Sequence, residues 1–155
     1  PAPARRRDAA RRAARNHAPF RPRHRDAEPG AARVTANDLP RFDMILLGMG
    51  GDGHTASLFP NTAALDETER LVVANEVPQL NTTRITFTVP LINAARRVLF
   101  LVSGADKAEM LEQVISGPTG QFPSQRIHLT AGNLIWLVDE PAFSAIQSDL
   151  QPDSR

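Results

Sequence analysis

The stretch FDMILLGMGGDGHTASLFP, residues 42–60, places an apolar run directly before four glycines and a histidine. The run from 42 to 48 lies between Pro40 and the first of these glycines, and its continuity is typical of a strand buried on both faces. Glycines permit tight turns and let backbone amides approach a ligand closely. The stretch therefore predicts a buried strand that ends in a functional loop.

The rest of the chain repeats this alternation of apolar runs and helical segments. Further strands are predicted at 97–104 and 134–139, β-branched strands at 70–77 and 84–89, a short strand around His128, and helices at 91–95, at 105–117 and from Pro141. In the helix over 105–117, one face carries Ala108, Leu111, Val114 and Ile115, and Gly117 is the stop signal. Buried strands separated by helices predict an α/β fold, with an open, doubly wound, mostly parallel sheet and helices on both faces.

Ligands of such sheets bind at the carboxyl ends of the strands. Here these ends are Gly48–His54, Ser103–Lys107 and Asp139–Glu140. We therefore expect His54 and Lys107 to act together, although 53 positions separate them.

The glycine loop has three interpretations. Gly48, Gly50 and Gly53 fit the dinucleotide fingerprint G-x-G-x-x-G, but that motif needs a full helix after its third glycine, and Pro60 arrives too early. A second interpretation is a plain strand-to-helix turn capped by Asp52. In the third, His54 acts as a general base on water, Asp52 orients it, and nearby N–H groups face the oxyanion that forms.

Composition separates the chain into two parts. Residues 1–36 carry ten arginines against three acidic residues, a net charge of +7, whereas residues 37–155 carry eight basic and fourteen acidic residues, −6. The first part has almost no large apolar residues, so we expect a disordered or loosely helical arm before one α/β domain. Such an arm could bind acidic partners, but nothing in its pattern points to nucleic acid.

The sequence lacks two features that would point to other classes of protein. The chain has no cysteine, which agrees with a reducing compartment such as the cytoplasm. No run of 18 apolar residues is present, so we expect no membrane span.

Three segments carry a resemblance to a known family: DMILLGMGGDGHTASLFP, TRITFTVPLINAARRVLFLVSGADKAEML and LIWLVDEPA. Their order and spacing resemble those of 6-phosphogluconolactonases, within the wider glucosamine-6-phosphate isomerase/lactonase superfamily. The resemblance covers residues 39–146. It implies hydrolysis of 6-phospho-D-glucono-1,5-lactone to 6-phosphogluconate in the cytoplasmic pentose phosphate pathway, with no metal or organic cofactor.

The resemblance also implies site residues. His54 matches the family's catalytic histidine and Asp52 the adjacent acid. The implied substrate-binding residues are Gly48, Gly50, Gly51 and Gly53 in the loop, with Arg84 and Lys107 as cations for the 6-phosphate. One observation does not depend on the resemblance. Lys107 lies near the start of a predicted helix, where the helix dipole disfavours a cation unless an anion binds at the same place.

The related aminosugar-phosphate isomerases and deaminases are the alternative. They resemble this loop but continue GHIAFNEP, with a glutamate that serves ring opening just before the proline. Phe59 stands at that position here, so hydrolysis is favoured. A non-catalytic fragment whose basic arm binds acidic partners stays open as another class.

Family members are longer at the amino end, where they carry an SGGSTP-like phosphate loop and a DER-like motif. Neither occurs in this sequence, and residues 1–36 resemble out-of-frame coding sequence or a false start. We therefore expect the carboxyl-terminal portion of a lactonase-like domain without its first strands. We also expect weak or absent activity from this chain alone. The sequence does not set an oligomeric state.

Overall fold

The computed structural model of the chain describes residues 39–150, and their side chains as far as residue 146. These residues belong to the larger of the two units into which the chain divides, residues 33–155. The predictions made for the arm, residues 1–36, lie outside the described residues.

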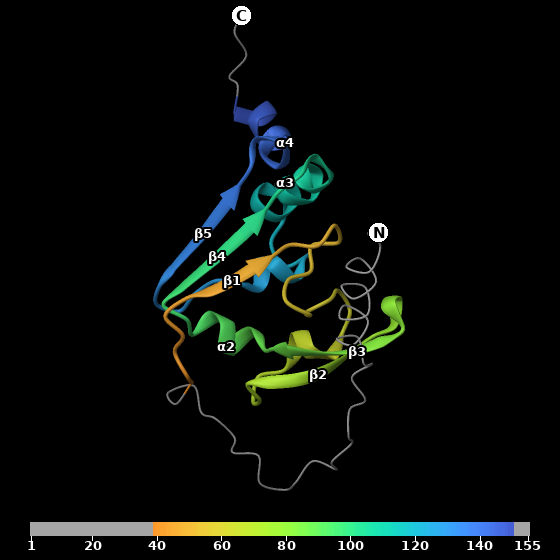
Figure 1. Ribbon diagram of the computed structural model, residues 1–155, viewed down its shortest axis with the longest axis vertical. Helices are drawn as coiled ribbons and strands as arrows, with labels where there is room; N and C mark the ends of the chain where they lie inside the picture. The colour runs from red at the N-terminus through yellow and green to blue at the C-terminus, as the bar shows by residue number, and fades with distance from the viewer. Residues whose placement is uncertain (1–38, 151–155) are drawn as a thin grey trace, which may run out of the picture. The chain divides into compact units, whose positions relative to one another are not determined.

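Three strands form the parallel sheet that the apolar runs predict. They are β1 (Ile45–Gly48), β4 (Arg97–Val102) and β5 (Asn133–Val138), in the order β1-β4-β5 (Figure 1). The register sets Gly48 opposite Leu101 and Leu101 opposite Leu137. The carboxyl ends of all three strands therefore lie at the same end of the sheet. The predicted α/β class with its parallel sheet is confirmed.

The two β-branched strands form a separate antiparallel sheet. They are β2 (Val72–Val77) and β3 (Thr82–Phe87), joined by the 3-10 helix Pro78–Leu80. Asn81 takes a left-handed conformation, with φ of 46°, which asparagine tolerates better than most residues. Only an antiparallel pairing can be made with so short a connection.

The helices follow the strands as expected, with small differences at their ends. They are α2 (Val89–Asn93), α3 (Ala108–Ser116) and α4 (Glu140–Leu150), with 3-10 helices at Ala63–Asp66, Ala105–Lys107 and Pro123–Arg126. The predicted helix over 105–117 thus begins as a 3-10 turn. The helix ends at Gly117, whose backbone becomes extended with ψ of 175°, and a Cβ there would lie 2.3 Å from the carbonyl oxygen of Gln113, so the position requires glycine.

One face of the sheet carries the core. Val98 and Phe100 of β4, Ile92 of α2 and Leu111 of α3 are completely buried and belong to one apolar cluster. Phe100 stacks on Trp136 of β5 at 4.0 Å between ring centroids. Helices α3 and α4 lie side by side next to the ends of β4 and β5 (Figure 1).

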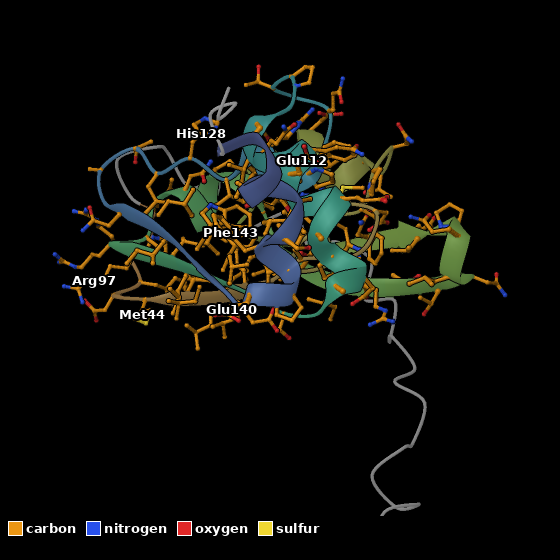
Figure 2. The ribbon with its side chains drawn as sticks, turned by 90° about the horizontal axis from the view of Figure 1, so that it is seen from above. Met44, Arg97, Glu112, His128, Glu140 and Phe143 are labelled. Atoms are coloured by element: carbon orange, nitrogen blue, oxygen red, sulfur yellow. The ribbon has the colours of Figure 1, made fainter. Side chains whose placement is uncertain are left out.

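The prediction that the strands are buried on both faces is wrong for the described residues. On the face opposite the core, Leu46 is 58% exposed, Leu101 50% and Leu137 52%. The reason is that α3 and α4 both pack on the core face, where their residues Leu111 and Ala142 join the cluster. Figure 2 shows Phe143 of α4 toward the strands and Met44 at the lower rim of the view, away from both helices.

Two smaller predictions also fail. Ile115 is 46% exposed, because the buried stripe of α3 is narrow and consists of Ala108, Leu111 and Val114. His128 is not in a strand: its backbone N–H donates to Oδ1 of Asn93 at 3.0 Å instead of to a neighbouring strand.

Candidate active site

The loop after β1 has no helix at its end. Residues 49–62 form turns and one isolated bridge, and the next helical element is the 3-10 helix Ala63–Asp66. A pyrophosphate held by the dinucleotide fingerprint rests on the N-terminus of a helix that begins at its third glycine. The structure therefore excludes the dinucleotide interpretation. It also excludes the plain strand-to-helix turn, because no α-helix follows the glycines.

His54 is held by three contacts. Its ring Nδ1 lies 2.6 Å from Oδ1 of Asp52, and its backbone N–H donates to the same oxygen at 3.2 Å. Its ring stacks on Phe59 with 4.0 Å between centroids. The imidazole is 28% exposed and the carboxylate 45%, so the pair is open to a substrate. Two hydrogen bonds and one aromatic stack therefore fix the imidazole at the carboxyl end of β1.

The carboxylate of Asp52 is in its charged form at neutral pH. Partial burial acts to raise its pKa, but the hydrogen bonds with His54 outweigh it, and the pKa of Asp52 lies below its ordinary value. A carboxylate at Nδ1 stabilises the tautomer that carries the proton on that nitrogen. The lone pair of His54 is then on Nε2.

Gly50 is required by its contact with the histidine. A Cβ on this residue would lie 2.1 Å from Nδ1 of His54 and 2.8 Å from Oδ1 of Asp52. Its backbone N–H donates to the carbonyl oxygen of His54 at 2.9 Å. Any side chain here would displace the imidazole, so the glycine is part of the site rather than of a flexible linker.

Gly53 is fixed by a residue that the sequence analysis missed. Its carbonyl oxygen accepts hydrogen bonds from the backbone N–H of Ser124 at 3.0 Å and from its hydroxyl at 2.8 Å. Ser124 is 1% exposed. Gly53 has φ of 74°, and a Cβ would meet Phe122 at 2.8 Å. The two partners are 71 positions apart in the chain, and no local pattern marks such a contact.

Gly48 is the first glycine of the loop, and its carbonyl oxygen accepts a hydrogen bond from the hydroxyl of Thr55 at 2.8 Å. Thr55 is completely buried. This bond joins the end of β1 to the residue that follows the histidine. It therefore ties the glycine-rich part of the loop, residues 49–54, to the end of β1.

Lys107 lies beside the loop, as the strand-end rule predicts. A methyl group on Gly51 would lie 4.0 Å from Nζ of Lys107. The ammonium is paired with Asp106 at 2.9 Å, and its side chain is 26% exposed. The hydrogen bond and charge of Lys107 lower the pKa of Asp106. Lys107 precedes α3 directly, as its N-cap residue.

Arg84 occupies a different place. It lies in β3 opposite Asn75 and is exposed. Its side chain is on the same face of the hairpin as that of Thr86, two residues on, whose hydroxyl accepts a hydrogen bond from the N–H of Ser57 at 3.2 Å. Arg84 is thus on the hairpin face whose residues Thr86 and Asn75 bond to Ser57, in the loop segment that follows the histidine.

A cavity of about 570 Å³ joins these elements. Its lining consists of Ile45, Leu46, Leu47, Gly48, Met49 and Gly50, then His54, Ala56 and Ser57, and finally Ile85, Thr86 and Phe87. Phe87 also stacks on Phe42 with 5.5 Å between centroids. Arg84 and Lys107 are not among the lining residues.

Among residues 39–150, no cluster of three histidine, cysteine or acidic side chains is arranged to hold a metal ion. No helix in the same part of the chain is long and apolar enough to cross a membrane.

The fold and the site together define a class: an open α/β domain that presents acid–base and cationic side chains at the carboxyl ends of parallel strands. Within that class, the chain belongs to the family of glucosamine-6-phosphate isomerases and 6-phosphogluconolactonases, whose model matches residues 3–136. The family resemblance is confirmed, and the family model covers residues 39–136 of the range 39–146 that carried it. The match also extends at its amino-terminal end into the basic segment.

Several proteins to which the chain is similar are named as 6-phosphogluconolactonases. The chain is 49% identical over 113 residues to 6-phosphogluconolactonase of Synechocystis sp., covering 71% of this chain and 45% of the relative. It is 46% identical to probable 6-phosphogluconolactonase of Drosophila melanogaster, covering 72% of the chain and 47% of the relative. The structure of 6-phosphogluconolactonase from Trypanosoma cruzi matches with a TM-score of 0.61 at 31% identity, over 69% of this chain and 42% of that one. The chain therefore spans about half the length of the relatives that it matches.

Proposed function

We propose that this chain carries the acid–base site of a 6-phosphogluconolactonase, which hydrolyses 6-phospho-D-glucono-1,5-lactone to 6-phosphogluconate. The observation that carries the proposal is the imidazole of His54, held by Asp52 at the carboxyl end of β1 with Lys107 beside the same loop. The relatives named above support the substrate, because they are named for this lactone.

The chemistry follows from the histidine–carboxylate pair. With Nδ1 turned to Asp52, Nε2 of His54 takes a proton from water as the water oxygen bonds to the lactone carbonyl carbon. Backbone N–H groups of the glycine loop stabilise the oxyanion. The bond between the carbonyl carbon and the ring oxygen then breaks, and the proton on Nε2 passes to that oxygen. The products are a carboxylic acid and a free hydroxyl, and His54 is regenerated.

The cations serve the 6-phosphate in this proposal. Lys107 is the only lysine of the chain, and its ammonium lies next to Gly51. An ammonium is a compact point charge for a phosphate, and a guanidinium can add two parallel hydrogen bonds. Arg84, exposed on β3, is the second phosphate ligand that we propose.

Phe59 disfavours the aminosugar isomerase alternative. Its ring stacks directly on His54, at the position where that alternative needs a carboxylate. An aromatic ring cannot exchange a proton with the sugar. It also covers one face of the imidazole, which limits the ways in which the base can turn.

The proposed substrate also implies a pathway and a cellular compartment. The partner is a small sugar-phosphate lactone, and the pathway that consumes it places the enzyme in the cytoplasm. The absence of cysteine from the sequence agrees with that compartment.

Binding of the product tests the site in the chain as it exists. We expect 6-phosphogluconate to shift the amide signals of Gly50–His54 and the imidazole signals of His54 saturably in NMR spectra. Gluconate, which lacks the phosphate, should give no shift at the same concentrations. Lys107→Met should weaken binding at least tenfold, roughly one charge-assisted contact.

Arg97→Met is the matched control, because Arg97 is an exposed cation at the opposite end of β4. It should bind the product like the unchanged chain. Absence of a saturable shift, or equal affinity of the Lys107 variant and the unchanged chain, would refute the proposed site.

A further inference from the structure

Asn75 is a polar residue on the buried face of β2. Val73 and Val77 lie on the same face, and all three side chains are buried. An amide without hydrogen-bond partners is costly in such a place, so buried amides are normally bonded. A third apolar side chain would avoid that cost. The hydrogen bonds that Asn75 makes therefore indicate why an amide occupies this position.

The amide of Asn75 holds the segment that follows the histidine. Its Nδ2 donates to the carbonyl oxygen of Ser57 at 2.8 Å and to the hydroxyl oxygen of Thr62 at 2.9 Å. On β3, the buried hydroxyl of Thr86 accepts a hydrogen bond from the backbone N–H of Ser57 at 3.2 Å. The β2–β3 hairpin thus bonds to both ends of the segment 57–62. We call these three bonds, with Asn75, Thr62 and Thr86, the Asn75 network.

Thr62 connects this network to Phe59. Its buried hydroxyl donates to the carbonyl oxygen of Phe59 at 2.8 Å while it accepts from Asn75. The two residues between Phe59 and Thr62 form a turn in which Asn61 is left-handed, with φ of 60°. The hydroxyl closes this turn and joins it to β2. The backbone of Phe59 is therefore held relative to the hairpin.

Phe59 in turn supports the imidazole of the proposed base. Its ring stacks on that of His54 with 4.0 Å between centroids and 25° between the ring planes. His54 lines the cavity of about 570 Å³, whereas Phe59 is buried and is not among the lining residues. Phe59 therefore supports the imidazole from the protein side and leaves the cavity to the substrate. Movement of this ring would free the imidazole to turn away from Asp52, whose carboxylate lies 2.6 Å from Nδ1.

The Asn75 network also lies next to the proposed phosphate ligand. Asn75 is opposite Arg84 in the register of the hairpin. Directly opposite residues of an antiparallel pair lie on one face, with their Cβ atoms about 5 Å apart. One buried amide therefore joins the segment that supports His54 to the strand pair that carries Arg84. This arrangement fixes the base relative to the cation.

We propose that Asn75 and Thr62 are positioning residues for the proposed lactone hydrolysis. Acting through Phe59, they keep the imidazole of His54 in a fixed place relative to Arg84. Their role in catalysis rests on the proposed function. The contacts themselves exist in the chain without substrate, so they can be tested separately.

Thr62→Val tests the connection with a small change of shape, because it replaces the hydroxyl by a methyl group. The measurement is the NMR shift of the two carbon-bound ring protons of His54, in the full chain without ligand. The stacked ring of Phe59 moves these signals upfield. In Thr62→Val they should move downfield, towards those of an unstacked histidine. Thr62→Ser should restore them, because it keeps the hydroxyl.

Asn75→Ser tests the same connection from the hairpin. The serine side chain is too short to reach both Ser57 and Thr62, so we expect a downfield shift of the His54 signals here too. This variant decides the test if Thr62→Val does not fold. In both variants 6-phosphogluconate should still bind, because Lys107 is unchanged, but it should shift the His54 signals less than in the unchanged chain.

Thr88→Val is the matched control. The hydroxyl of Thr88 is also buried and donates to the carbonyl oxygen of Arg70 at 2.8 Å, outside the segment 57–62. Its loss should destabilise the chain as the loss of the Thr62 hydroxyl does, but it should leave the His54 signals unchanged. The control therefore separates positioning of the imidazole from a general loss of stability.

Four results would overturn the proposal: His54 signals that Thr62→Val and Asn75→Ser leave unchanged, a shift that persists in Thr62→Ser, an equal shift in Thr88→Val, or an undiminished His54 response to 6-phosphogluconate in both variants. The ligand-free signals do not depend on lactone hydrolysis. Failure of the positioning is therefore distinguishable from failure of the proposed function, which product binding by the unchanged chain measures.

Discussion

Replacement of Gly50 by alanine tests how the site holds its histidine. The new methyl group would lie 2.1 Å from Nδ1 and 2.2 Å from Cε1 of His54. Ordinary contact begins near 3.4 Å, so the imidazole must move by about 1.3 Å. The hydrogen bond of 2.6 Å between Nδ1 and Asp52 cannot survive that displacement.

The expected stability cost is small, whereas the expected functional cost is large. His54 and Asp52 are 28% and 45% exposed, so losing their bond should lower the free energy of unfolding by only about 1 kcal/mol or less. A displacement of about 1 Å in a catalytic group can cost roughly 10²-fold in rate. Gly50→Ala should therefore leave a folded chain with a misplaced base.

The assay is an NMR titration of the Asp52 carboxyl carbon. In the unchanged chain, its pKa lies below the ordinary value because His54 donates to the carboxylate. In Gly50→Ala, that pKa should rise. Gly48→Ala is the geometric control, since nothing lies within 4 Å of a methyl group at Gly48, and it should leave the pKa of Asp52 lowered. An unchanged Asp52 pKa in the Gly50 variant would refute the contact that we infer.

The remaining predictions concern the same loop. Ser124→Ala should lower the free energy of unfolding in urea by about 0.5 to 1.5 kcal/mol, because the buried carbonyl of Gly53 loses its hydroxyl donor but keeps the backbone N–H of Ser124; an unchanged free energy of unfolding would contradict a stabilising role for this hydroxyl. The stabilising contribution of the Asp52 carboxylate should be complete above pH 4 or so and lost as the pH falls through its lowered pKa. The urea midpoints of Asp52→Asn and the unchanged chain should thus converge in acid, and a constant difference would contradict this sign. His54→Ala should reduce lactone hydrolysis by about 10² to 10⁴, the usual share of a general base, and an unchanged rate would remove His54 from the chemistry.

Sequence reasoning located the elements whose signals are local. The continuous apolar run of β4 and the Gly117 stop of α3 depend on neighbouring residues only, and both have their expected places. The strand-end rule also placed Lys107 beside the glycine loop, because parallel strands deliver their carboxyl ends to one edge.

The features that sequence reasoning missed depend on contacts between distant segments. An apolar run does not reveal whether a second layer covers it, so the exposure of Leu101 could not be read from it. The bonds from Ser124 to Gly53 and from His128 to Asn93 join segments 71 and 35 positions apart. Neither partner carries a local mark of the other.

A crystal structure of the chain with bound 6-phosphogluconate tests the central claim most directly. We expect the phosphate within about 4 Å of Nζ of Lys107, the range of an ion pair. The C1 carboxylate should lie about 2.6 to 3.2 Å from Nε2 of His54, which is hydrogen-bond reach. A product molecule bound with C1 away from His54, or with its phosphate out of reach of Lys107, would contradict the account.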